Sequence, residues 1–291
     1  MHMRRSVPNS LKRTTKMNKK KMLIIAAAVS AALLLGGIFL LTKDSVRQSS
    51  TEKEMKPYMP SPKILSELDD ISTSEPVTEA ATVGDDIVTT VTAAAPSSEL
   101  PPELRQQLID TAAELNNAYP DSLGWLYIPD TVISYPIMQS NDNEFYLSHA
   151  CNGRSLKAGS VFLDYRCENR LMNPINILYG HNMRNGSMFA QVTSYTNDSF
   201  FEAHRYGWLA TPDTVYRIDF FSCAIADSSD SLYDGRTPIA EWIPHISEKS
   251  VVIREMTFSD EDRFISLSTC SYEFRNARTV LTGKLVDTIG G

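Results

Sequence analysis

The sequence has few cysteines, and their spacing lacks the patterns typical of disulfide-rich or zinc-binding proteins. Its 291 residues include four, none in a C-x-x-C pair: Cys151, Cys167, Cys223 and Cys270. A chain of this length can bury a sufficient core without cross-links. We therefore expect neither a disulfide framework nor a metal site, although one bridge among the first three cysteines stays open. Nucleotide and flavin motifs are also missing, so we expect no cofactor.

Acidic residues are missing from the first 21 positions, which carry eight Lys and Arg side chains. The remaining chain has 20 basic against 35 acidic residues, a net charge of −15. A basic arm is compatible with nucleic-acid binding, but the residues after it favour another interpretation. Residues 22–41 contain no charged side chain, and as a helix they would span roughly 30 Å, the thickness of a bilayer core.

A cleaved signal peptide is the alternative for residues 22–41. Its apolar region would be shorter, about 7–15 residues, and small residues would mark a cleavage site. Here the apolar run ends in Phe39-Leu40-Leu41 without such a site. We therefore predict an uncleaved, single-pass transmembrane anchor. The basic residues before it predict a cytoplasmic tail over residues 1–21 and an extracellular remainder in the cell membrane, with no nucleic-acid partner.

Aromatic residues are almost absent from residues 42–98, where Tyr58 is the exception. This segment is rich in Ser, Thr, Glu and Pro, and such a composition cannot bury enough apolar surface to offset the entropy cost of ordering. We predict a disordered stalk that holds a folded domain away from the membrane.

The folded domain is predicted over residues 99–291 and begins with a helix near Pro101 and Pro102. After Pro120 the pattern changes to short β-branched or aromatic runs separated by Gly, Pro, Asn and Asp. Strands are expected at 123–129, 132–139, 159–165, 175–180, 207–211, 215–226, 249–256, 263–270 and 278–286. Another helix is expected over 237–249. A mainly β fold with a closed or nearly closed barrel fits this pattern.

Cys270 ends the run "RFISLSTC". Strict alternation places it on one strand face with Phe264, Ser266 and Ser268, and places Ile265, Leu267 and Thr269 on the other. The small polar residues beside it leave room for a substrate. The residue is therefore either a buried hydrophobe or a nucleophile, and a nucleophile needs a base or cation because an unperturbed thiol has a pKa of about 8.5.

His181 is the best-placed histidine to act as that base. It follows the apolar run "INILYG", where Gly180 permits close backbone approach and Asn182 offers a hydrogen bond. Arg278 opens the strand after Cys270, and its forked donors suit a developing oxyanion. A structural histidine and a solvated arginine are the alternatives.

These segments resemble the sortases, specifically class B. The similarity rests on "LYGHNMRNGSMF" around His181 and on "SLSTCSYEFRNARTVLTGKL" around Cys270 and Arg278. The runs "YPIMQSNDNEFYLSH" and "GSVFLDYRC" are also similar to class B strands. Ser266 stands where the family often has threonine. The resemblance covers about residues 100–291.

The resemblance implies an eight-stranded β-barrel with N-terminal helices and a helix in the long loop before the last strands. It also implies a cysteine transpeptidase, a thiol peptidase that cleaves the C-terminal sorting signal of surface proteins after threonine. Cys270 would form a thioester, His181 would transfer protons, and Arg278 with the backbone N–H of Ser271 would stabilise the oxyanion. The resemblance suggests Asn182, Ser268, Thr269 and Ser271 as substrate-binding residues.

Several alternatives stay open at this point. The acceptor is either an amine of the cell-wall (peptidoglycan) precursor or a pilin lysine, since wall anchoring and pilin polymerisation use the same three residues. A papain-like protease has cysteine before histidine, the reverse of the order here. A non-catalytic, membrane-tethered binding domain would have no need to keep His181, Cys270 and Arg278 together.

Overall fold

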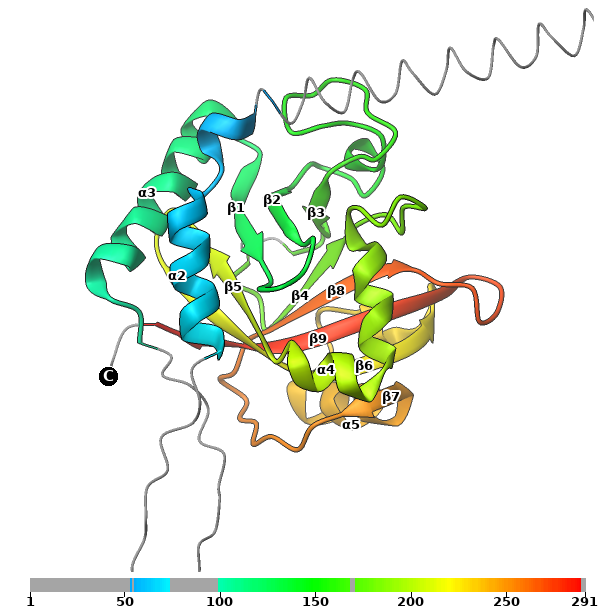
Figure 1. The fold of residues 1–291 in the computed structure, drawn as a ribbon. Coiled ribbons are helices and arrows are strands. Elements are labelled where there is room, and N and C mark those ends of the chain that lie inside the picture. The colour runs from blue at the N-terminus through cyan, green and yellow to red at the C-terminus, as the bar shows by residue number, and fades with distance from the viewer. Residues whose placement is uncertain (1–52, 54, 74–98, 168–170, 289–291) are drawn as a thin grey trace, which may run out of the picture. The chain divides into compact units, whose positions relative to one another are not determined.

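A computed structural model describes residue 53 and residues 55–73, 99–167 and 171–288. Within these ranges the chain forms a nine-stranded sheet, of which eight strands close into a barrel (Figure 1). The strands are β1 (Ser122–Tyr127), β2 (Ser134–Met138), β3 (Val161–Leu163), β4 (Ile175–Tyr179), β5 (Tyr206–Ala210), β6 (Val215–Asp227), β7 (Ser250–Ile253), β8 (Phe264–Cys270) and β9 (Ala277–Asp287).

The barrel order is β5-β1-β2-β3-β4-β8-β9-β6, and the pairing of β6 with β5 closes it. Strand β7 pairs with β6 outside this ring. Most neighbours are antiparallel, but β2 with β3 and β4 with β8 are parallel. Closure leaves no free edge among the eight barrel strands, so the predicted eight-stranded barrel is confirmed.

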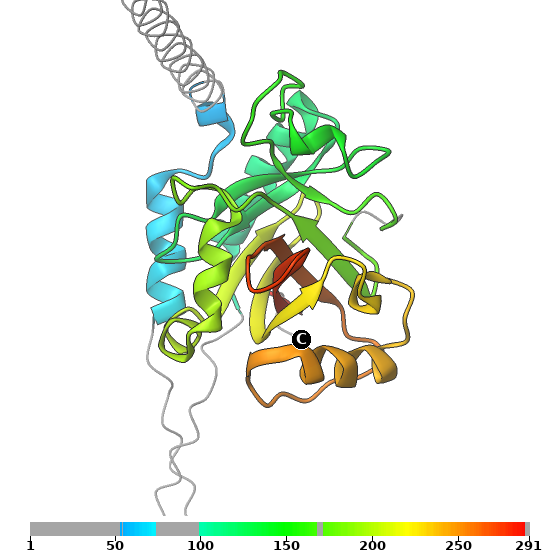
Figure 2. The same cartoon turned by 90° about the vertical axis from the view of Figure 1, so that its right-hand side faces the viewer.

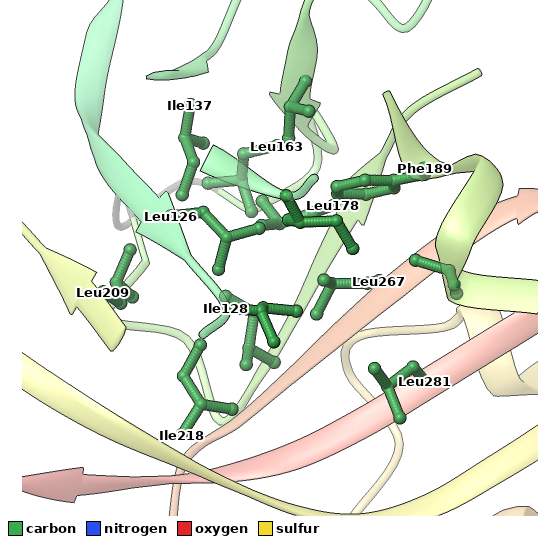
Figure 3. Close-up of a cluster of buried hydrophobic side chains, with 14 of the residues drawn as sticks. Leu126, Ile128, Ile137, Leu163, Leu178, Phe189, Leu209, Ile218, Leu267 and Leu281 are labelled. Carbon is green, nitrogen blue, oxygen red and sulfur yellow. The ribbon is translucent and has the colours of Figure 1, made fainter. Parts of the chain in front are cut away.

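The barrel interior is filled by aliphatic side chains that alternate along the strands. Figure 3 shows Leu178, Leu267 and Leu281 among the residues of this cluster. On β8, Ile265 and Leu267 belong to the interior cluster, whereas Phe264 packs outside the barrel. The alternation predicted for "RFISLSTC" is therefore confirmed, and Cys270 lies on the outer face of the strand end.

Two N-terminal helices cover the outer face of β1 and β5. Helix α3 (Pro102–Ala118) buries Leu104, Leu108 and Leu115, and its predicted position is confirmed. Helix α2 (Pro62–Thr73), preceded by the 3-10 turn η1 (Lys56–Tyr58), joins the same apolar cluster.

The prediction of a disordered stalk is wrong for residues 55–73. Leu68 is fully buried, and the indole N–H of Trp208 donates to Ser72 Oγ at 3.0 Å. The apolar residues of α2 are few, but their helical spacing places them on one face. The mean composition of the segment does not show this spacing. The other residues of the predicted stalk, 42–52, 54 and 74–98, lie outside the described residues.

A long insertion separates β6 from β8. It contains η4 (Ser231–Tyr233), α5 (Ile239–Lys249, the orange helix in Figure 2) and β7. Trp242 of α5 is fully buried, packs against Phe264 and donates its indole N–H to Leu232 O at 3.1 Å. The helix predicted in the long loop is confirmed, with Pro244 inside it.

The remaining helical segments lie between strands: η2 (Phe145–Leu147), η3 (Phe189–Thr196) and α4 (Asp198–Ala203).

The predicted localisation as a single-pass membrane protein needs correction. Among the described residues, no helix combines the length and apolar character needed to cross a bilayer. The segment 22–41 on which the prediction depended, and the tail over 1–21, lie outside the described residues.

Candidate active site

The parallel pairing of β4 and β8 brings the two strand ends together. Tyr179 lies opposite Ser268, and the pairing continues one step beyond the strands. The N–H of Gly180 donates to Ser268 O at 3.2 Å, and the hydroxyl of Thr269 donates to Gly180 O at 2.8 Å. The paired segments therefore run together up to Gly180 and Thr269, which directly precede His181 and Cys270 in the chain.

Antiparallel pairing brings Arg278 to the same end of the barrel. Cys270 of β8 lies directly opposite Arg278 of β9, which in turn lies opposite Ala226 of β6. The guanidinium donates to Ala277 O at 3.0 Å. Residues far apart in the sequence therefore gather where β4 and β8 end and β9 begins.

Cys270 differs from the other three cysteines in its exposure. All four are free thiols, so the disulfide left open by the sequence is not formed. Cys151, Cys167 and Cys223 are buried, whereas Cys270 is partly exposed. Burial raises the pKa of the Cys167 thiol and raises that of Cys223 to about 12, which keeps both protonated at neutral pH. Cys270 is the accessible thiol.

The imidazole of His181 is hydrogen-bonded to a backbone carbonyl. Its Nε2 lies 2.8 Å from the carbonyl oxygen of Leu147, in η2. The next residue, Asn182, donates its side-chain N–H to Cys270 O at 2.8 Å. Asn182 therefore links the histidine loop to the cysteine strand.

The residues predicted to bind substrate lie beside Cys270, and most of their polar groups bond protein atoms. Ser268 and Thr269 are buried, and Thr269 bonds the Gly180 carbonyl. The N–H of Ser271 donates to Ala277 O at 3.0 Å, so it is not free to act as an oxyanion donor here. The buried hydroxyl of Ser271 has no hydrogen-bond partner. Their roles in substrate binding stay predictions.

A buried polar network beneath the site was not anticipated from the sequence. Asp164, only 1% exposed, accepts a bidentate bond from Arg166 at 2.6 and 2.9 Å and a third bond from the Tyr179 hydroxyl at 2.9 Å. Burial raises the pKa of the Asp164 carboxyl, but hydrogen bonds from Arg166 and Tyr179 outweigh it, and the net pKa is lowered.

The network continues to the strand that carries Cys270. Tyr179 stacks against Tyr233 of η4, with ring centroids 6.2 Å apart, and the Tyr233 hydroxyl is 2.8 Å from Ser268 Oγ. Burial raises the pKa of Tyr233 to about 12, partly offset by the Ser268 hydrogen bond and by the charge of Arg278. The sequence signal that could have indicated Asp164 is a charged residue directly after the apolar run "VFL".

A metal site requires a group of metal-ligating side chains. Among the described residues, no three or more His, Cys, Asp or Glu side chains group together as potential metal ligands.

Known proteins are similar in sequence to most of the folded domain. No protein-family profile matches the chain. The chain is 35% identical over 213 residues to Sortase B of Listeria monocytogenes, which covers 70% of this chain and 84% of that protein.

Solved structures show the same fold. The Staphylococcus aureus sortase B–substrate complex is 25% identical with a TM-score of 0.58, covering 62% of this chain and 87% of that one. A class B sortase of Streptococcus pyogenes involved in pilus biogenesis is 30% identical with a TM-score of 0.56, covering 60% and 97%.

The closed barrel, its accessible strand-end thiol and these similarities define a cysteine transpeptidase of the surface-protein-anchoring type. Two features indicate the subclass. A helix lies in the insertion between β6 and β8, and the chain matches Sortase B over 213 residues. The chain belongs to the class B sortases.

Proposed function

We propose that the protein cleaves a C-terminal sorting signal after threonine, with Cys270 as nucleophile, and transfers the acyl group to an amine. The observation that carries this proposal is the register of three adjacent strands, β4, β8 and β9. Arg278 lies directly opposite Cys270, and the end of β4, two residues before His181, pairs with the end of β8, two residues before Cys270. Cys270 is also the accessible thiol of the four.

In the first step, the Cys270 thiol passes its proton to His181, and the resulting thiolate Sγ attacks the threonine carbonyl carbon and forms a C–S bond. The oxyanion that develops lies within reach of the Arg278 guanidinium, a permanent positive charge. When the C–N bond breaks, the leaving amine takes a proton from His181. The product of this step is a thioester on Cys270.

In the second step, an amine attacks the thioester and gives a proton to His181. The C–S bond then breaks, the thiolate of Cys270 leaves, and it takes the proton back from His181. The two acyl transfers form one amide bond for each amide bond cleaved. Because the N–H of Ser271 is engaged by Ala277 O, Arg278 supplies the larger part of oxyanion stabilisation in this scheme.

Two acceptors fit this chemistry. An amine of the cell-wall precursor would give wall anchoring of surface proteins. A lysine of a pilin would give polymerisation, and the similarity to the S. pyogenes enzyme involved in pilus biogenesis supports this second candidate. The catalytic steps are identical in both cases.

The proposal is tested by turnover of threonine-containing sorting peptides by the full chain, followed by chromatography and mass spectrometry. Peptide cleavage alone is expected without an acceptor, and a new amide product with an added peptide amine. Cys270→Ala is expected to show neither. Turnover that survives in Cys270→Ala would contradict the proposal.

A further inference from the structure

His181 has a hydrogen-bond partner that determines which ring nitrogen carries the proton. Its Nε2 lies 2.8 Å from the backbone carbonyl oxygen of Leu147. A carbonyl oxygen can only accept a hydrogen bond, so Nε2 must be the donor and carry hydrogen. In the neutral imidazole, Nδ1 is then the unprotonated nitrogen, and proton transfer takes place there.

The Leu147 carbonyl is itself held by a capped turn. It belongs to η2 (Phe145–Leu147), and Asp142 binds two backbone N–H groups where this turn begins. One carboxylate oxygen of Asp142 accepts the backbone N–H groups of Glu144 and Phe145, each at 2.8 Å. This arrangement resembles an N-cap, which fixes the first turn of a helix. The N–H of Leu147 in turn donates to Glu144 O at 3.1 Å.

A glycine, Gly159, lies close to the same carbonyl. Gly159 has φ of +61°, a conformation unfavourable for other residues. A Cβ at this position would lie 2.8 Å from Leu147 O and 2.4 Å from Tyr146 O. Any side chain at Gly159 would therefore push the Leu147 carbonyl away from its present place.

Tyr146 anchors the turn to the barrel. Its side chain is buried, and its hydroxyl donates to Asp121 at 2.8 Å. Its carbonyl accepts the N–H of Ser160 at 2.9 Å. Leu147 is 40% exposed, so its side chain adds little packing, and these backbone contacts fix the carbonyl.

We propose that Asp142 and Gly159 are positioning residues that aim the Leu147 carbonyl at His181 and so fix the Nε2–H tautomer, leaving Nδ1 to exchange protons during acyl transfer. This inference rests on the proposed role of His181. Neither Asp142 nor Gly159 touches the reacting atoms, and both act through the carbonyl.

The tautomer is measurable directly by ¹⁵N NMR of the full chain with labelled histidine. The two ring nitrogens are distinguished by their couplings to the ring protons, and the resonances of His181 are assigned from their loss in His181→Gln. At a pH where the ring is neutral, protonated Nε2 and unprotonated Nδ1 are expected in wild type. A wild-type ring with the proton on Nδ1 would overturn the proposal, even if the peptide is turned over normally.

Variants test the two positioning residues. Asp142→Ala removes the acceptor, and we expect a mixture of tautomers and a kcat lowered about fivefold, the size of one lost hydrogen bond, with KM for the sorting peptide little changed. Asp142→Asn retains an acceptor oxygen and is expected to restore the tautomer and most of kcat. Gly159→Ala is expected to shift the tautomer as well.

A matched control is Asn197→Ala, which removes the cap of α4, where Asn197 Oδ1 accepts the Phe200 N–H at 3.2 Å. It is expected to lower the melting temperature without changing the tautomer or kcat. If Asp142→Ala changes only the melting temperature, as the control does, the turn does not position His181. Loss of turnover in wild type would instead contradict the proposed function and leave the NMR result to be judged separately.

Discussion

In the proposed mechanism, Arg278 is the residue whose charge the reaction needs most. It lies opposite Cys270 across a single strand pair, and its guanidinium stays positive at every physiological pH. We propose that it acts on charge that develops only in the transition state. Removing it should therefore slow the chemical step more than it weakens binding of the peptide.

We expect Arg278→Ala to lower kcat by about 10²–10³-fold, the usual effect of losing one oxyanion donor, with a smaller change in KM. Steady-state kinetics with a cleavable sorting peptide measures both values. Arg275→Ala is the matched control, because Arg275 is exposed on the same turn between β8 and β9. Equal effects of the two variants would show that Arg278 acts only through the general charge of the loop.

The lowered pKa of Asp164 predicts that the free energy of unfolding depends on pH. Its pKa is lowered in the folded protein, where Arg166 and Tyr179 bond the carboxylate. The stabilisation is therefore complete above the ordinary Asp pKa, about 3.9, and is lost as the pH falls through the folded-state value.

At neutral pH, we expect Asp164→Asn to lower the free energy of unfolding by about 1–3 kcal/mol, because the Arg166 pair and a buried acceptor are weakened. The difference from wild type should shrink as the pH falls below about 4. Urea unfolding at several pH values measures it, with Asp260→Asn on the surface as control. A difference that is constant with pH would contradict the account.

At the scale of elements, the sequence predicted most of the barrel because its strands are short, alternating and clearly separated. The parallel register of β4 and β8 could not be predicted, since it depends on strands almost ninety residues apart. The same is true of the contact between the Leu147 carbonyl and His181, because a backbone oxygen leaves no signature in the sequence.

The N-terminal helix α2 was missed for a different reason. Its surroundings are polar, and only a few apolar residues, among them Ile64 and Leu68, attach it to α3 and the barrel. The mean composition of the segment favours disorder. The segment is ordered because these residues lie on one face of the helix and pack together against the domain. The folded domain therefore includes residues 55–73.

We expect Leu68→Ala to lower the free energy of unfolding by about 2–4 kcal/mol, since it empties a fully buried site between helices. Ser66→Ala, at an exposed position in α2, is the control and should leave stability nearly unchanged. Chemical denaturation of the full chain provides the measurement. If Leu68→Ala behaves like the control, then α2 does not pack on the domain in solution.

At the scale of the whole molecule, the fold protects three thiols and presents one. Closure of the barrel and its helical cover bury Cys151, Cys167 and Cys223, while Cys270 lies at the accessible strand end. Thiol reactivity therefore reports on the integrity of the entire domain.

A chromogenic disulfide reagent should react rapidly with one thiol of the native protein and with four after denaturation. The native reaction should disappear in Cys270→Ala, because the remaining thiols are buried. Adding a reductant should not change the melting temperature, since none of the four forms a disulfide. Rapid reaction of two or more native thiols would show that the buried cysteines are accessible.

The most direct test of the central claim is the intact mass of the full chain after incubation with threonine-containing sorting peptides and no added amine. A wild-type adduct equal to the peptide acyl fragment is predicted, retained in Cys151→Ala and absent in Cys270→Ala. Added amine should remove the adduct and release a new amide. An adduct that persists in Cys270→Ala, or peptide cleavage by that variant, would contradict the account.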